Sequence, residues 1–153
     1  MLSQMTLTVQ FAATWAMTGI IWFVQLVQYP SFARVDPASF QAFHRQHSSS
    51  ISAVVAPLMI IEAFSAVAFL WAPLRSQSPR QIWLGIGLVL VIWASTFVLQ
   101  IPAHTRLASG FDEATWRMLV RSNWIRTFAW SARAALVSYW AYEALRLGTP
   151  MSA

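Results

Sequence analysis

The chain alternates between four long apolar stretches and short polar connections. The stretches cover residues 5–29, 51–72, 82–102 and 123–147. Each is long enough for a membrane-spanning helix, which needs about 20 residues. Pro30, Pro102 and Gly148 lie at or just beyond the ends of three of them, as residues that stop helices often do. The pattern predicts an all-α fold in which a single domain, residues 1–153, is an integral membrane four-helix bundle.

Two of the connections, 30–50 and 103–122, fall on the same side of such a bundle, and each carries a helix-start signal. Asp36 precedes a proline and Asp112 precedes an amphipathic stretch, so both predict N-caps. The spacing after Asp36 places His44 and His47 on one apolar face. We therefore expect two short interfacial helices on this side, which we call the rim.

Composition supports a membrane protein and narrows its chemistry. Hydrophobic residues make up 58% of the chain and charged residues 10%, whereas soluble domains carry about 25% charged residues. The absence of cysteine excludes disulfides, thiolate ligands and cysteine nucleophiles. The net charge of +5 favours contact with anionic membrane lipids rather than nucleic acid. A homo-oligomer or a larger membrane complex is left open.

Arginine is distributed unevenly between the two sides of the predicted bundle. The two rim connections contain Arg34, Arg45, Arg106, Arg117 and Arg121, and the other side contains Arg75, Arg80 and Arg146. Because cytoplasmic loops carry an excess of positive residues, the rim is expected to face the cytoplasm.

Two ionisable residues lie deep inside apolar stretches. Glu62 and Arg133 are each about 15–16 Å from the rim end of their helices at the helical rise of ~1.5 Å per residue, so they can meet. Arg126 and Trp130 share a helix face with Arg133. A charged group at this depth is costly and is by default a candidate functional site.

Further polar residues point toward the same rim. Gln100 and His104 continue a stripe that begins at Thr96, and Gln25 and Gln28 end the first stretch. All three histidines of the chain therefore lie on the rim side of a polar shaft that ends at Glu62 and Arg133.

One hypothesis for this shaft is a metal site formed by His44, His47, His104 and Glu62. Imidazole and carboxylate ligands suit iron, copper or zinc, and haem has less support. The competing interpretation is structural, with histidines bonded to carbonyls at helix ends and Glu62 neutralising Arg133. The cofactor thus stays unknown at this level.

A second hypothesis uses the arginines to bind a planar anion. The guanidinium groups of Arg126 and Arg133, beside Trp124 and Trp130, suit an enolate, phenolate, quinone or lipid headgroup. The structural alternative is that Arg126 reaches toward the rim and Arg133 pairs with Glu62.

Several segments resemble a known group of proteins. They are QLVQYPSF at 25–32, Pro57 with Met59 and Glu62, QIPAH at 100–104, and NWIRT at 123–127 followed by Trp130 and Arg133. These resemble small bacterial four-helix membrane proteins of unknown function, which in turn are similar to the anthrone-oxygenase-like membrane family. The resemblance implies oxygenation of a polycyclic phenol or a related apolar aromatic molecule, without a recognised cofactor motif. It also implies a location in a bacterial inner membrane.

The leading functional prediction is an oxygenase-like oxidoreductase acting on an apolar aromatic or quinone-like molecule in a one-sided polar pocket. The alternatives are a non-catalytic subunit that binds a ligand, haem or quinone, and a pathway for protons or small solutes. The candidate catalytic residues are Glu62, Arg126, Arg133 and Asn123. The candidate substrate-binding residues are Gln25, Gln28, Gln100, Trp124, Thr127 and Trp130.

Overall fold

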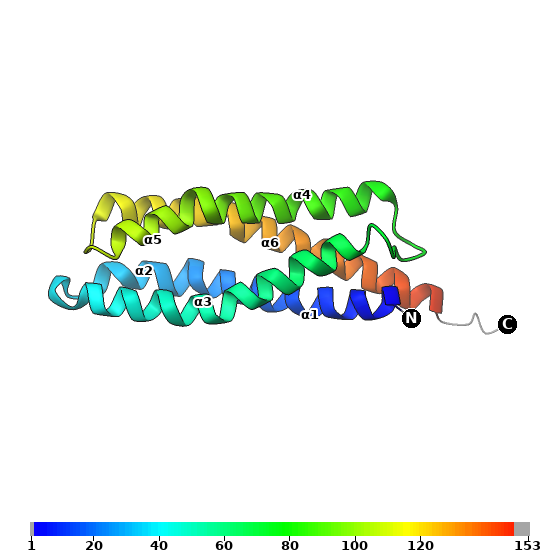
Figure 1. Cartoon of the computed structure of the whole chain (residues 1–153), viewed down its shortest axis with the longest axis horizontal. Helices are drawn as coiled ribbons and strands as arrows, with labels where there is room; N and C mark the ends of the chain where they lie inside the picture. The colour runs from blue at the N-terminus through cyan, green and yellow to red at the C-terminus, as the bar shows by residue number, and fades with distance from the viewer. Residues whose placement is uncertain (1, 149–153) are drawn as a thin grey trace.

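The computed structural model describes residues 2–148, which form four helical rods (Figure 1). The first rod contains α1 (Leu2–Phe23), the π-helix η1 (Val24–Gln28), α2 (Tyr29–Ser31) and the 3-10 helix η2 (Phe32–Arg34). The second is α3 (Pro37–Ala68), and the third contains α4 (Pro79–Ser95), the π-helix η3 (Thr96–Gln100) and α5 (Ile101–Leu107). The fourth is α6 (Glu113–Gly148). The described residues contain no strand, which confirms the all-α bundle.

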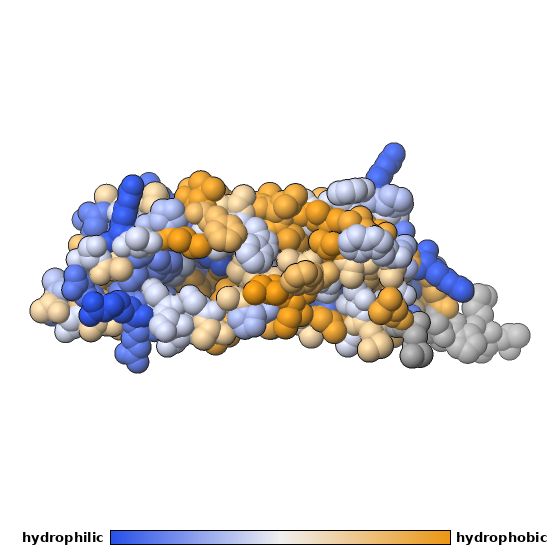
Figure 2. All heavy atoms as spheres, in the orientation of Figure 1, coloured by the Kyte–Doolittle hydropathy of each residue, from blue (hydrophilic) through white to orange (hydrophobic). Residues whose placement is uncertain are grey.

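Three of the four rods are long and apolar enough to cross a membrane, namely Leu2–Arg34, Pro37–Ala68 and Pro79–Leu107. Figure 2 shows hydrophobic side chains over the middle of the bundle and hydrophilic ones at both ends, as expected for a membrane protein in contact with lipid. The fourth predicted span lies in α6, which is 36 residues long but is not among the three. Its interior-facing Arg126 and Arg133 lower its apolar character.

The two predicted rim helices begin where expected but are not separate helices. Asp36 accepts a hydrogen bond from the Ala38 N–H (2.9 Å), and Asp112 accepts one from the Thr115 N–H (2.8 Å). Hydrogen bonds from the Thr115 side chain and backbone lower the pKa of the exposed Asp112 carboxyl. From these caps α3 continues to Ala68 and α6 to Gly148. The expectation of short interfacial helices was wrong, because neither a glycine nor a proline lies at 38–56 or 114–147 to stop them.

Pro30 and Pro102 do not end their helices either. Each proline follows a π-helical turn, in which the Tyr29 N–H bonds the Val24 carbonyl and the Ile101 N–H bonds the Thr96 carbonyl. A proline ring in a regular α-helix clashes with the carbonyl four residues earlier, and the wider turn gives it room. The first rod therefore reaches the rim at Arg34 and the third at Leu107.

The rods pack unevenly, which leaves one side of the bundle loosely joined. α1 packs along α3 and α6, and α4 packs along α6, whereas α3 meets α5 over few residues. Figure 1 shows that α3 bends in its middle so that its second half approaches α4, and Pro57 lies inside this helix. The first half of α3 consequently contacts α5 over only a short stretch near the rim.

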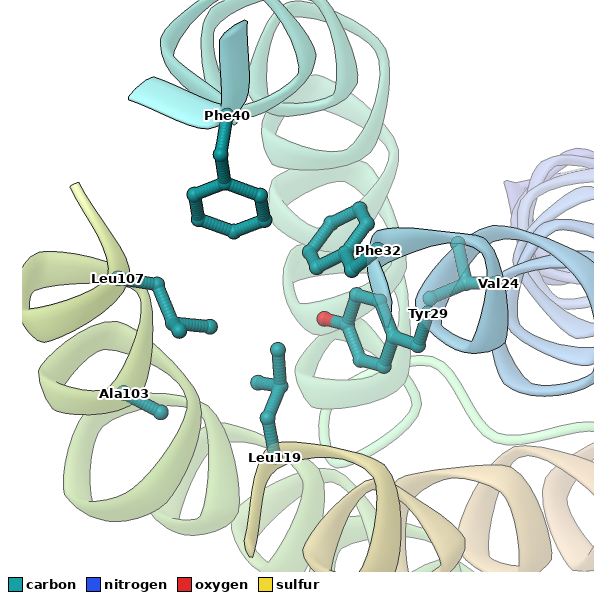
Figure 3. Packing of buried hydrophobic residues seen from close by; sticks show 7 residues of the cluster. All are labelled: Val24, Tyr29, Phe32, Phe40, Ala103, Leu107 and Leu119. Atoms are coloured by element: carbon teal, nitrogen blue, oxygen red, sulfur yellow. The ribbon is translucent and has the colours of Figure 1, made fainter. Parts of the chain in front are cut away.

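A cluster of buried hydrophobic residues holds the rim end together, drawn in Figure 3 as Val24, Tyr29, Phe32, Phe40, Ala103, Leu107 and Leu119. Phe32 packs edge-on against Phe40, with ring centroids 6.1 Å apart. The hydroxyl group of Tyr29 points into the space between the helices (Figure 3). The cluster thus anchors a polar group inside an apolar surrounding.

Candidate functional site

A cavity of about 670 Å³ lies between α3 and the third rod, with residues of the first rod and Arg126 of α6 completing its wall. Met17, Ile21, Met59 and Trp93 line it on the side toward the middle of the bundle. Its size falls in the range of about 300–1,000 Å³ that is usual for small-molecule sites. An apolar chamber of this kind suits the body of an apolar ligand.

The rim side of the same cavity carries a chain of hydrogen-bonding groups. The Tyr29 hydroxyl lies 3.0 Å from Nε2 of His104, whose Nδ1 lies 3.1 Å from Nε2 of His44. The Tyr29 hydroxyl also lies 3.4 Å from the Gln100 Oε1. His44 is 1% exposed, and its Nδ1 has no hydrogen-bond partner. Because each imidazole can exist in two tautomers, this chain can hold its protons in two alternative arrangements.

The three histidines gather as the sequence predicts, but without the fourth proposed metal ligand. Their rings are close, with centroids 5.2 Å apart for His44 and His104 and 6.1 Å for His47 and His104. Phe32 packs edge-on against His47 at 5.0 Å. Within residues 2–148 no group of three or more histidine, cysteine or acidic side chains is arranged to hold a metal ion. The nitrogens of His44 and His104 bond each other instead of pointing to a shared position.

Glu62 lies in a different polar centre, deeper in the bundle, where it forms the ion pair with Arg133 that the depth argument predicts. Both side chains are almost completely buried. Gln10 Nε2 donates to Glu62 Oε1 at 3.0 Å, and Arg133 Nη1 donates to the Gly85 carbonyl at 2.9 Å. Ser65 donates to Gln10 Oε1 at 2.9 Å. This centre ties all four rods together, and none of its residues lines the cavity.

Arg126 lies in the cavity wall, close enough to Tyr29 for an electrostatic interaction. It is 6% exposed. Its Nη1 donates to the Asn123 Oδ1 at 3.3 Å, and its Nε has no partner. Among the described residues no carboxylate pairs with Arg126, in contrast to Arg133.

Asn123 belongs to a network that supports Arg126 rather than to the cavity wall. Its Nδ2 donates to Gln25 Oε1 at 2.9 Å, and Thr127 donates to the same oxygen at 3.4 Å. Gln25 Nε2 in turn donates to the Val120 carbonyl at 3.2 Å. These contacts join η1 to α6 and hold the Asn123 side chain within hydrogen-bonding distance of the Arg126 guanidinium.

The remaining predicted binding residues lie in different environments, and only one of them lines the cavity. Gln100 lines the cavity. Trp130 is fully buried in the core, and Trp124 packs edge-on against Trp22 at 5.7 Å, away from the cavity. Gln28 is half-buried, and its carbonyl accepts a hydrogen bond from a neighbouring serine.

Two groups of buried polar residues were not predicted from the sequence. Tyr29 begins the hydrogen-bonded chain that continues to His104 and His44, and its position between a glutamine and a proline was the only local signal. Gln10 and Thr14, which contact Glu62, lie at i and i+4 in an apolar stretch. Polar residues at that spacing on a spanning helix are themselves a sign of an inward-facing partner.

No family model, curated protein or solved structure matches the chain. The resemblance to anthrone-oxygenase-like membrane proteins therefore stays a prediction.

Proposed function

We propose that the protein binds an apolar aromatic or quinone-like molecule from the bilayer and exchanges a proton with its oxygen-bearing end, as an oxidoreductase-like enzyme. The observation that carries this proposal is the hydrogen-bonded chain of Tyr29, His104 and His44 at the rim side of an otherwise apolar cavity. The ligand's ring system would occupy the chamber near Met59 and Trp93.

The position of the cavity supports entry from the lipid. Ile60 on α3 and Phe97 and Ile101 beside it on the third rod line the cavity and are 46%, 56% and 47% exposed. All three lie within rods that are apolar enough to span a membrane. A lipophilic molecule dissolved in the bilayer would therefore meet an apolar edge of the cavity before its polar end.

The residues have distinct roles in this proposal. Tyr29 contacts the ligand oxygen, and His104 and His44 carry the proton toward the rim by exchanging tautomers. In the oxygenase form of the proposal, with anthrone as the substrate, loss of a ring proton leaves an enolate. Dioxygen is the oxidant: one of its oxygen atoms becomes the new ring carbonyl and the other leaves as water. Glu62 and Arg133, which lie outside the cavity wall, act by holding the rods in place.

The through-pathway alternative receives less support from the geometry. The cavity borders a core cluster that includes Ile92, Ala129 and Trp130, which are 1%, 6% and 0% exposed. A proton entering the histidine chain from the rim would meet this apolar layer before the Glu62–Arg133 centre.

Ligand binding and turnover can be tested on the protein in lipid nanodiscs. We would measure the shift in thermal unfolding with 1-naphthol, anthrone and a short-chain quinone, because a ligand that binds the native state raises its stability. Tyr29→Phe and His104→Asn should weaken binding or slow turnover, and Tyr142→Phe, at a 60% exposed tyrosine, should not.

The outcomes separate the functional classes. Turnover of anthrone that depends on His104 supports the oxygenase-like enzyme. Binding without turnover of any of the three compounds would replace it with a non-catalytic ligand-binding subunit. Absence of binding to all three would overturn the proposal.

A further inference from the structure

Two arginines one heptad apart on α6 have opposite surroundings. Arg133 is fully buried and paired with Glu62. Arg126 is only 6% exposed, yet no carboxylate among the described residues pairs with it. A buried charge without a counter-charge is strongly disfavoured, because the group loses its water without gaining a partner. Within residues 2–148, Arg126 therefore lacks the buried counter-charge that Glu62 provides for Arg133.

The charge of the cavity wall also indicates a site for a negatively charged ligand. The lining includes two arginines and three histidines, and no aspartate or glutamate. The second arginine, Arg45, is exposed at the rim. The nearest acid along α3, Glu62, is already neutralised by Arg133 and is absent from the wall. The site as a whole thus offers positive charge and hydrogen-bond donors without a built-in anion.

Hydrogen bonds to neighbouring polar side chains fix the orientation of Arg126. Asn123 accepts from Nη1, and Asn123 is itself held by Gln25. The Nε of Arg126 has no partner in the fold. Tyr29, which interacts electrostatically with Arg126, lines the same cavity. An oxygen placed between Arg126 and Tyr29 could accept hydrogen bonds from both, as guanidinium groups commonly provide to planar oxyanions.

We infer that the site takes a planar aromatic molecule carrying one negative charge on oxygen, which completes the ion pair that Arg126 lacks. This inference rests on the proposed function, from which it takes the aromatic ring system of the ligand. It adds that the oxygen-bearing end of the ligand carries a negative charge. Phenolates, enolates and aromatic carboxylates share this chemistry. Neutral quinones and neutral lipids do not.

The test compares two ligands of the same shape that differ in charge, 9-anthracenecarboxylate and 9-anthracenecarboxamide, at neutral pH. Binding to the full chain in uncharged-lipid nanodiscs is followed by energy transfer to anthracene from tryptophan, since Trp93 lines the cavity. The carboxylate should bind at least about tenfold more tightly, as expected for hydrogen bonds to a charged group. Arg126→Gln should remove this preference and leave amide binding nearly unchanged.

Two further variants keep the experiment decisive. Arg121→Gln removes the same charge from an exposed position on the same helix and should preserve the preference. Arg126→Lys keeps the charge and should retain much of the preference. If Arg126→Gln does not fold, the wild-type comparison of the two ligands still decides, and loss of the preference in the charge-retaining Arg126→Lys variant would count against the inference. Equal or tighter binding of the amide by the wild-type protein would overturn the inference while leaving the proposed function intact. Binding of neither compound would count against the proposed function itself.

Discussion

At the scale of single residues, the chemistry of this bundle is divided between two arginines. Arg133 completes an ion pair with Glu62 that is shielded from both water and the cavity. Arg126 faces the cavity next to Tyr29 and is braced by Asn123. The first arrangement suits a structural role and the second suits ligand binding. Sequence spacing alone places the two on one helix face without telling them apart.

The buried ion pair should be sensitive to removal of either partner. Glu62→Gln or Arg133→Gln alone leaves one uncompensated charge in the interior, and we expect a loss of about 3–5 kcal/mol in unfolding free energy. The double substitution should recover part of that loss. Thermal unfolding in detergent would measure all three variants.

The exposed pair Arg117–Glu113 offers the control for this comparison, because its side chains are 60% and 64% exposed and Glu113→Gln should have little effect. A Glu62→Gln protein as stable as the wild type would show that the charge of Glu62 is not needed to hold Arg133.

Gly85 provides a second residue-level prediction, because Arg133 approaches it closely. A Cβ atom at this position would lie 2.9 Å from Arg133 Nη1 and 3.2 Å from a ring carbon of Trp140. Gly85→Ala should therefore destabilise the protein, by about 1–3 kcal/mol for an overpacked core. Gly87→Ala, where nothing lies within 4 Å, should be neutral or stabilising. Equal unfolding temperatures for the two variants would contradict the close contact.

At the scale of elements, the two π-helical turns are what bring the rim residues into one place. η1 and η3 precede Pro30 and Pro102 by the same interval, and they present Tyr29, Gln100 and His104 to each other. A π-turn contains one more residue than an α-turn, so it changes the faces on which the following side chains lie. Such turns often occur at functional sites.

Deleting Val98 tests the relation between the π-turn and the proline. Val98 is 69% exposed, and its removal would turn η3 into a regular α-helical turn. Pro102 would then lie inside an α-helix, which costs about 3 kcal/mol. We expect the deletion to lower the unfolding temperature and Pro102→Ala to restore most of it.

Deletion of Leu90 serves as the control for this experiment. Leu90 is 63% exposed but lies in regular α4, so its loss rotates all later residues by about 100° and should not be rescued by Pro102→Ala. If the Val98 deletion is as stable as the parent without the second change, Pro102 is not the reason for the π-turn.

At the scale of the whole molecule, the rods place the cavity and its polar groups near one end. The start of α1 and the last turns of α6 lie at the opposite end (Figure 1). The rim connections carry more arginine than the other side. By the positive-inside rule we propose that the rim faces the cytoplasm, so that a proton leaving the histidine chain would be released there.

This orientation can be measured directly because the chain has no native cysteine. Gln4→Cys marks the end distant from the rim and Ser109→Cys marks the rim, and both positions are exposed. In intact bacterial spheroplasts a membrane-impermeant maleimide should label Gln4→Cys and leave Ser109→Cys unlabelled until the cells are opened. The reverse pattern would place the cavity on the outer side.

The sequence by itself determined the helical class, the apolar rods, the two aspartate caps and the depth at which Glu62 meets Arg133. These follow from local composition, from capping chemistry and from the constant rise of a helix, which need no knowledge of distant residues. The tertiary structure decided the rest. Only the tertiary structure shows that Tyr29 contacts His104, that Glu62 lies apart from the histidines, and that no acid in the described part of the chain pairs with Arg126. The reason is that helix rotation and the π-turns depend on packing between rods rather than on residue spacing within one rod.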